Sequence, residues 1–172
     1  MDLSPVLVTG LKKKVIISFV AMNKGDKEVI KALVSTIKKS SQPANRKAVW
    51  VLRQWGQMHP KDLSEQLNPL IEQLGIERDS SVIRDLMSIF LSVELNDEQQ
   101  GRILDKAFAF LNSGTYDLGV MFNSMKFLEK SCRQWPDLIP EFVEVLKRQR
   151  DLHTSTFCKQ ATKLIFKFEK LR

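Results

Sequence analysis

The stretch ANRKAVWVLRQWGQMHP, which runs from Ala44 to Pro60, decides the fold. Its apolar residues recur at every third or fourth position, and this is the spacing of one face of an α-helix. At about 100° per residue, Ala48, Leu52 and Trp55 point in one direction. The stretch therefore predicts an amphipathic helix that buries Trp55 in a core.

A second tryptophan, Trp50, lies on the other side of the same predicted helix. It shares a stripe with Arg46, Arg53 and Gln57, roughly 140° away from the apolar face. An aromatic ring between two arginines is typical of a recognition anchor. It is equally typical of a ring that packs under an arginine or under a neighbouring helix, and both interpretations stay open.

The same helical pattern recurs along the chain in pairs of segments. The first segments of the pairs begin near Asp26, Pro60, Asp97 and Pro136, at spacings of 34, 37 and 39 residues. A period of this length is typical of helical repeat proteins. We therefore expect an all-α domain over residues 1–172, with an opening helix over 5–23 and repeats at about 26–58, 60–93, 97–135 and 136–171.

The opening helix is predicted from its cap and its apolar spacing. Ser4 and Pro5 suit a helix start, and Gly25 suits a helix end. Its predicted apolar stripe is Leu7, Leu11, Val15, Phe19 and Met22. Because many of its residues are β-branched, a strand is the competing prediction.

The second helices of the four pairs align on one predicted core ladder of three rungs. Equivalent residues of successive second helices are 35, 41 and 37 positions apart in the sequence. The rungs are Ala48, Ile83, Ser124 and Ala161; then Leu52, Met87, Leu128 and Ile165; then Trp55, Phe90, Ser131 and Phe168.

These helices carry a family resemblance. NRKAVWVLRQWG resembles the second helix of a HEAT repeat, while LNPLIEQLG and LIPEFVEVL look like the first helix, in which a proline precedes the apolar residues. The resemblance covers roughly residues 26–170. It implies an α-α superhelix, a short right-handed solenoid of about four HEAT-like repeats, whose second helices line a concave binding face.

Binding candidates follow from the stripe that contains Trp50 and from the matching positions of the later second helices. The last helix adds a lysine stripe, Lys159, Lys163, Lys167 and Lys170, which is either a solvated face or a track for a phosphate backbone or acidic peptide. Phe122, Glu129 and Phe166 also lie at positions of the later second helices that match the Trp50 stripe. The candidate binding residues are Arg46, Trp50, Arg53, Asp85, Lys126, Arg133, Lys159 and Lys163.

Charge is distributed unevenly along this basic protein, whose net charge is +7. Residues 1–61 hold 12 Lys and Arg against 3 Asp and Glu, residues 62–98 hold 2 against 9, and residues 99–172 hold 13 against 8. A polyanion-binding face would be better served without the acidic middle. The charge pattern therefore favours nucleic acid only weakly.

Few residues suggest catalysis or metal binding. Cys132 and Cys158 lack metal-ligand spacing, so we expect two buried free thiols, too far apart to bridge. His59 and His153 sit near helix ends without an obvious nucleophile, and capping or packing is expected of both. We expect no cofactor, no metal and no catalytic residue.

Targeting signals are not evident either. Residues 1–10 lack a basic segment followed by an apolar run, and the apolar run at 15–22 is far shorter than a membrane span. We therefore expect a cytoplasmic protein without a membrane partner.

Two functions remain open from the sequence. The preferred one is a non-enzymatic scaffold that binds a protein or peptide on the concave face. The alternative is nucleic-acid binding, with a resemblance in architecture to the HEAT-like DNA glycosylases of alkylated bases. In that alternative Asp85 would stabilise a cationic sugar or position a water while Trp50 contacted the lesion.

Overall fold

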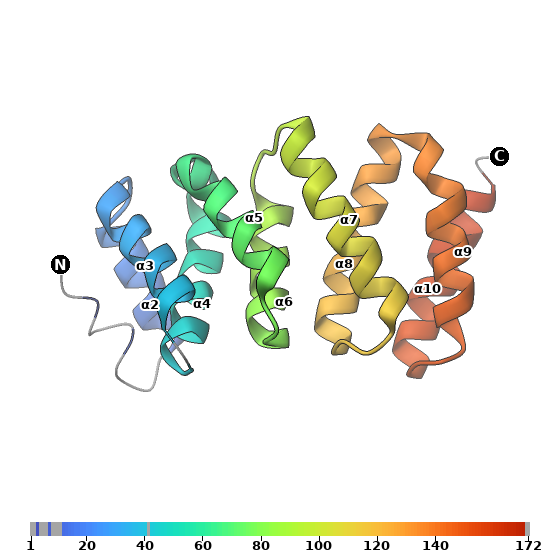
Figure 1. Cartoon of the computed structure of the whole chain (residues 1–172), viewed down its shortest axis with the longest axis horizontal. Coiled ribbons are helices and arrows are strands. Elements are labelled where there is room, and N and C mark those ends of the chain that lie inside the picture. Colours follow the sequence, from blue (N-terminus) through green and yellow to red (C-terminus); the bar gives the residue numbers. More distant parts are fainter. Residues whose placement is uncertain (1–2, 4–6, 8–11, 41, 171–172) are drawn as a thin grey trace. The chain divides into compact units, whose positions relative to one another are not determined.

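The computed structural model describes residues 3, 7, 12–40 and 42–170. The chain is 83% helical, and its described residues form no strand. The helices are α2 (Lys13–Met22), α3 (Lys27–Lys39), α4 (Ala44–Met58), α5 (Leu67–Ile76), α6 (Ser80–Ser92), α7 (Asp97–Ser113), α8 (Leu118–Gln134), α9 (Ile139–Arg150) and α10 (Ser155–Glu169), with the 3-10 helices η1 (Pro60–Gln66) and η2 (Pro136–Leu138) (Figure 1). The all-α prediction is confirmed, and α2 is a helix rather than a strand.

Aspartates at the N-caps explain where several helices begin. The side chain of Asp26 accepts hydrogen bonds from the second and third amides of α3, and Asp79 does the same for α6. Asp117 caps α8 through the amide of Val120. These bonds satisfy donors that have no partner within the helix.

Two first helices begin later than predicted. The sequence placed α-helix starts at Pro60 and Pro136, but both prolines open 3-10 turns, and the α-helices begin at Leu67 and Ile139. Proline has no amide hydrogen to donate within a helix, so it is tolerated only in a first turn. Pro69 and Pro140 therefore each fall in the first turn of an α-helix that starts just before them.

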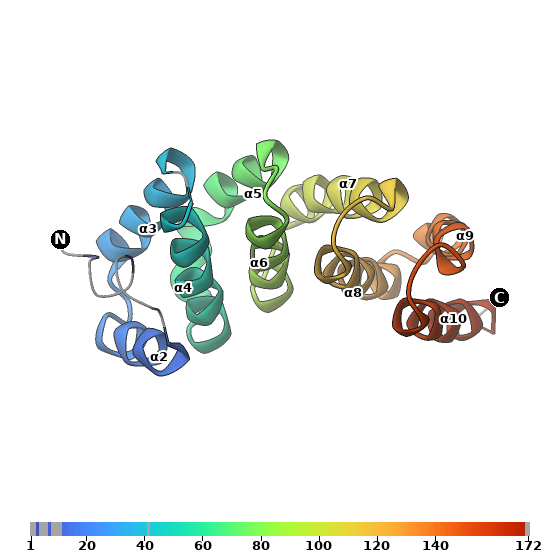
Figure 2. The same cartoon turned by 90° about the horizontal axis from the view of Figure 1, so that it is seen from below.

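Contacts divide the chain into two compact units, residues 1–100 (unit 1) and 101–172 (unit 2). In unit 1, helices α3 and α5 form one layer, and α2, α4 and α6 form the other (Figure 2). In unit 2, α7 and α9 lie in one layer and α8 and α10 in the other. The prediction of a single domain over 1–172 stays a prediction.

The predicted core ladder of the second helices is buried at every rung. All twelve side chains belong to the core, from Trp55 at 0% exposure to Ile165 at 6%. They line the side of each second helix that packs on its own unit. The 3.6-residue period was therefore sufficient to find the core face.

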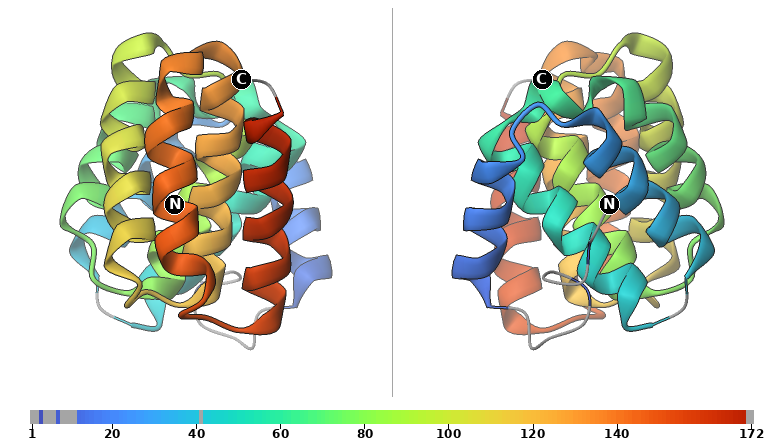
Figure 3. Two further views of the ribbon diagram at one scale, coloured as in Figure 1. Left: turned by 90° about the vertical axis from the view of Figure 1, so that its right-hand side faces the viewer. Right: turned by 90° about the vertical axis from the view of Figure 1, so that its left-hand side faces the viewer.

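The opening helix buries a different stripe from the one predicted. Val15 and Met22 were expected inside but are 42% and 78% exposed. Phe19 is buried as predicted, and Ile16 and Val20 are buried beside it. Helix α2 packs against α4, beside which it lies in the right-hand view of Figure 3. A helix with one principal neighbour buries one narrow face, and residues three and four apart occupy it. Ser4, Pro5 and Leu11 lie outside the described residues.

Trp55 lies in the core, as predicted, and its indole is hydrogen-bonded to η1. Its indole N–H donates to an Asp62 carboxylate oxygen at 3.0 Å. The same oxygen accepts the amide of Gly25 at 2.9 Å, at a turn where Gly25 has a left-handed φ of 76°. Asp62 thus ties η1 to α4 and to the turn before α3.

Cysteine burial differs from the prediction at one position. Both thiols are free; Cys132 is buried, but Cys158 is only half-buried. Within the described residues, no cluster of His, Cys, Asp and Glu could hold a metal ion. None of the described helices combines the length and the apolar character that crossing a membrane requires.

Candidate functional site: a groove between α8 and α10

The eight predicted binding residues all lie on second helices. Arg46, Trp50, Arg53 and Asp85 belong to unit 1, on α4 and α6; Lys126, Arg133, Lys159 and Lys163 belong to unit 2, on α8 and α10. Each unit therefore brings together four of them, and the two sets differ in how their charges are used.

In unit 1 the charged candidates form ion pairs that join α4 to α6 or to its N-cap. Arg53 donates to Asp85 at 2.8 Å, and Arg46 binds Asp79 at 2.8 Å. Asp85 is only 5% exposed, and Arg84 lies within 3.6 Å of the same carboxylate oxygen. These pairs hold two neighbouring helices together, so their charges are already compensated.

The sequence missed these pairs because they join residues more than thirty positions apart. In the glycosylase-like interpretation, Asp85 presents a carboxylate to a bound nucleotide. Its burial and its two arginine partners leave it in contact with the protein instead.

Trp50 is half-buried on α4. The sequence placed it on the face opposite the core, and the structure puts α2 against this helix. Its ring is therefore not the fully exposed anchor that one interpretation required.

A hollow between the starts of α4 and α6 has a volume of about 660 Å³. Polar side chains line it, and Gln42 and Arg46 both bind its Asp79. Ligand sites are mostly apolar, so a hollow lined by polar side chains alone is a weaker binding candidate.

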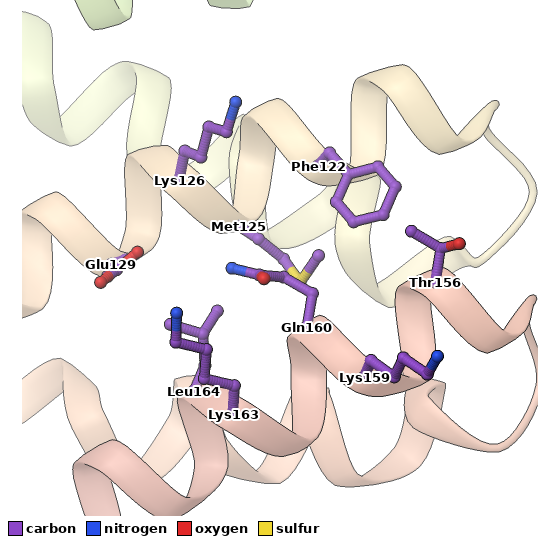
Figure 4. A pocket seen from close by; sticks show the side chains of 9 residues that line it. All are labelled: Phe122, Met125, Lys126, Glu129, Thr156, Lys159, Gln160, Lys163 and Leu164. Carbon is purple, nitrogen blue, oxygen red and sulfur yellow. The ribbon is translucent and has the colours of Figure 1, made fainter.

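Unit 2 holds a groove of a different kind, with a volume of about 570 Å³ (Figure 4). Apolar groups make up most of its surface. Three of the predicted residues meet here, Lys126 from α8 and Lys159 and Lys163 from α10. The full lining is Phe122, Met125, Lys126, Glu129, Thr156, Lys159, Gln160, Lys163 and Leu164. We call it the α8/α10 groove.

The floor of the groove is apolar. Met125 and Leu164 are 1% and 3% exposed, so each presents only an edge to the groove. Phe122 is half-buried, and its ring lies 5.9 Å from that of Phe157. In Figure 4, Gln160 and Met125 approach each other between the two helices. The floor is therefore made by residues that also serve the core.

Glu129 is the one carboxylate in the lining, and it is compensated by two cations. Its Oε1 accepts hydrogen bonds from the Lys167 ammonium at 2.6 Å and from the Arg133 guanidinium at 3.2 Å. Burial raises the pKa of Glu129, but these two partners outweigh burial and hold its pKa below the usual range. Arg133 is thus occupied by Glu129 and does not line the groove.

A buried thiol lies near this carboxylate. Burial, and then the charge of Glu129, raise the pKa of Cys132 to about 11. The thiol therefore stays protonated at neutral pH, which makes it a poor nucleophile.

The sequence did not predict four groove residues, Met125, Thr156, Gln160 and Leu164. Each lies one residue or one turn from a predicted position, because a groove between two helices is lined by adjacent faces of both. A wider stripe on each helix would have found them. None of the lining residues is a histidine or a cysteine.

His153, near the start of α10, has a packing role of the expected kind. Its ring lies 4.8 Å from that of Phe157 and within 3.0 Å of the Gln149 side-chain oxygen.

Comparison with known proteins identifies the family. No curated protein and no solved structure matches the chain. The family model described as a HEAT repeat domain matches residues 5–168. That range contains every helix bound given above except Glu169, and it extends the resemblance seen in the sequence over 26–170. The paired helices and the family match agree, and the chain belongs to the HEAT repeat family.

Proposed function

We propose that this protein is a non-enzymatic interaction module that holds a protein or peptide segment in the α8/α10 groove. HEAT repeats typically mediate protein interactions, and the family is generally non-enzymatic. The observation that carries the proposal is the groove itself, whose apolar floor lies between cationic walls.

The size and lining of the groove suit side chains of a partner. Ligand sites are mostly apolar hollows of roughly 300 to 1,000 Å³ with a few polar groups that fix orientation. Met125, Leu164 and Phe122 supply the apolar surface, and three lysines supply the polar groups. Burying a partner's apolar side chain on this floor would provide affinity.

Nucleic acid is the alternative occupant. The lysines favour it, because cations that neutralise phosphates release counterions. Phosphates, however, gain little from an apolar floor. The protein or peptide partner is therefore preferred.

The experiment is a selection of random peptides displayed on phage against the full chain. The blocking variant is Gln160→Trp, which places a large ring in the middle of the groove. The matched control is Gln57→Trp, the same change at an exposed position of α4. Circular dichroism establishes that both variants fold.

We expect enriched peptides to bind the wild type and the control but not the blocking variant. Peptides that bind all three proteins equally, or no enrichment at all, would contradict the proposal. Binding of a labelled DNA duplex and an RNA strand at about 50 and about 200 mM salt tests the alternative. A loss of affinity by orders of magnitude between those conditions supports nucleic acid.

A cytoplasmic location stays a prediction.

A further inference from the structure

The three lysines of the α8/α10 groove are free of the ion pairs that occupy other cations of unit 2. Lys126, Lys159 and Lys163 are exposed and form no ion pair with any described residue. Lys167 and Arg133, by contrast, both bind Glu129. The only carboxylate in the lining is thus neutralised from outside the groove, and the rim keeps an uncompensated positive charge.

These lysines stand on both walls of the groove. Lys159 and Lys163 are one helical turn apart on α10, and Lys126 stands on α8 (Figure 4). Residues four apart on a helix have their side chains about 6 Å apart. The floor of Met125 and Leu164 lies between the walls, so a ligand on the floor meets cations on either side.

The face of α10 that carries Lys159 and Lys163 has a further exposed aromatic residue and lysine beyond the groove. Phe166 follows Lys163 by three residues and is 60% exposed. Lys170 lies over its ring, 4.2 Å from the ring centre. A large exposed ring beside a cation offers a second place for an apolar group next to an acidic one.

We propose that the α8/α10 groove recognises an acidic peptide segment in which an apolar side chain stands between carboxylates. This inference rests on the proposed function and names the partner's chemistry. The apolar side chain lies on the floor against Met125 and Leu164. Carboxylates on one side of it reach Lys126, and those on the other side reach Lys159 and Lys163.

Charge complementarity selects this partner. A basic segment would face three uncompensated lysines, and like charges brought together at an interface are costly. A neutral apolar segment would fill the floor but leave the lysines without partners. A phosphate backbone would satisfy the lysines but would leave the floor unused.

The test uses four fluorescent probes and the full chain in anisotropy titrations. The first is a short peptide with a central Phe flanked by Glu and Asp. The second replaces the acidic residues by Lys, the third replaces the Phe by Ser, and the fourth is a single-stranded RNA. The variant is Lys159→Glu with Lys163→Glu. The control, Lys13→Glu with Lys39→Glu, makes the same change in net charge at exposed positions of unit 1.

We expect the first peptide to bind best and the paired variant to weaken it by roughly tenfold or more, because two attractions become repulsions. The control should change the affinity by less than about twofold, since its sites lie outside the groove. Removing the Phe should weaken binding by roughly tenfold, through the lost burial of its ring.

Other outcomes distinguish a failure of this inference from a failure of the proposed function on which it rests. If the phage selection yields basic or neutral peptides that the Gln160→Trp variant fails to bind, the groove is a peptide site but the acidic partner is wrong. If no selected peptide depends on the groove, the proposed function itself fails. If RNA binds more tightly than the first peptide and the Phe makes no difference, the occupant is a nucleic acid.

Discussion

Breaking the ion pair between Arg53 and Asp85 should destabilise unit 1, and more strongly when the arginine is the residue removed. The side chain of Asp85 is 7% exposed, whereas that of Arg53 is 30% exposed. Arg53→Met leaves a carboxylate buried with Arg84 as its nearest remaining cation, at 3.6 Å. Asp85→Asn leaves an arginine that still reaches water and still has a hydrogen-bond acceptor.

The magnitudes follow from that asymmetry in burial. Removing one partner of a buried pair costs about 3 kcal/mol or more, so we expect about 3 kcal/mol for Arg53→Met. A lost hydrogen bond between charged groups costs about 1.5 to 3 kcal/mol, and the smaller value applies to Asp85→Asn because an acceptor remains. In the double variant no buried charge is left, so its cost should be no greater than the about 3 kcal/mol of Arg53→Met alone, instead of the sum of the two single costs. The coupling energy is then roughly 1 to 2 kcal/mol.

Urea unfolding of the wild type, both single variants and the double variant, followed by circular dichroism, measures this cycle. Repetition in high salt is the control, because a buried pair is screened much less than an exposed one. Additive effects of the two single variants would refute the reasoning, because they would mean that Arg53 does not hold Asp85. The carboxylate would then be available for the binding or catalytic role that the sequence suggested.

Three further predictions concern unit stability. Trp55→Ala should cost about 3 to 5 kcal/mol as a core truncation, and Trp50→Ala less than half as much because that ring is only half-buried; equal costs in urea unfolding would overturn the assignment of faces. Gly114→Ala should cost about 1 to 3 kcal/mol, because its φ is 62° and a Cβ would lie 2.7 Å from the side-chain oxygen of buried Gln149; unchanged thermal stability would show that this contact yields. Burial raises the pKa of Asp62, but its hydrogen bonds from Trp55 and from a backbone amide outweigh burial and lower this pKa. The stability that the Asp62 carboxylate contributes is therefore fully present above the pKa of the unfolded chain, and it is lost as the pH falls through the lower pKa of the folded chain. Between about pH 5 and about pH 3, the urea midpoint of wild type should therefore fall more than that of Asp62→Asn, and parallel curves would contradict this.

The candidate site was only partly predictable from the sequence. The stripe opposite the core ladder included Lys126, Lys159 and Lys163, which line the α8/α10 groove, because helical periodicity tells which residues share a face. It equally included Arg53 and Asp85, which have the same residue types and the same spacing. What separates the two sets is a partner on another helix, and no local pattern contains that information.

The sequence by itself determined the helical pairs, their period and the twelve buried residues of the core ladder, from Ala48 to Phe168. These depend on apolar residues at the helical spacing, which is a local property of the chain. Only the tertiary structure decided which stripe of α2 is buried and which charges are free. A carboxylate or an ammonium group finds its partner according to the distance between packed helices, and that distance arises only when the chain has folded. Glu129 of α8 meets Lys167 of α10 for this reason, whereas its pair with Arg133 joins residues four apart on α8 itself. Lys126, Lys159 and Lys163 form no ion pair with any described residue.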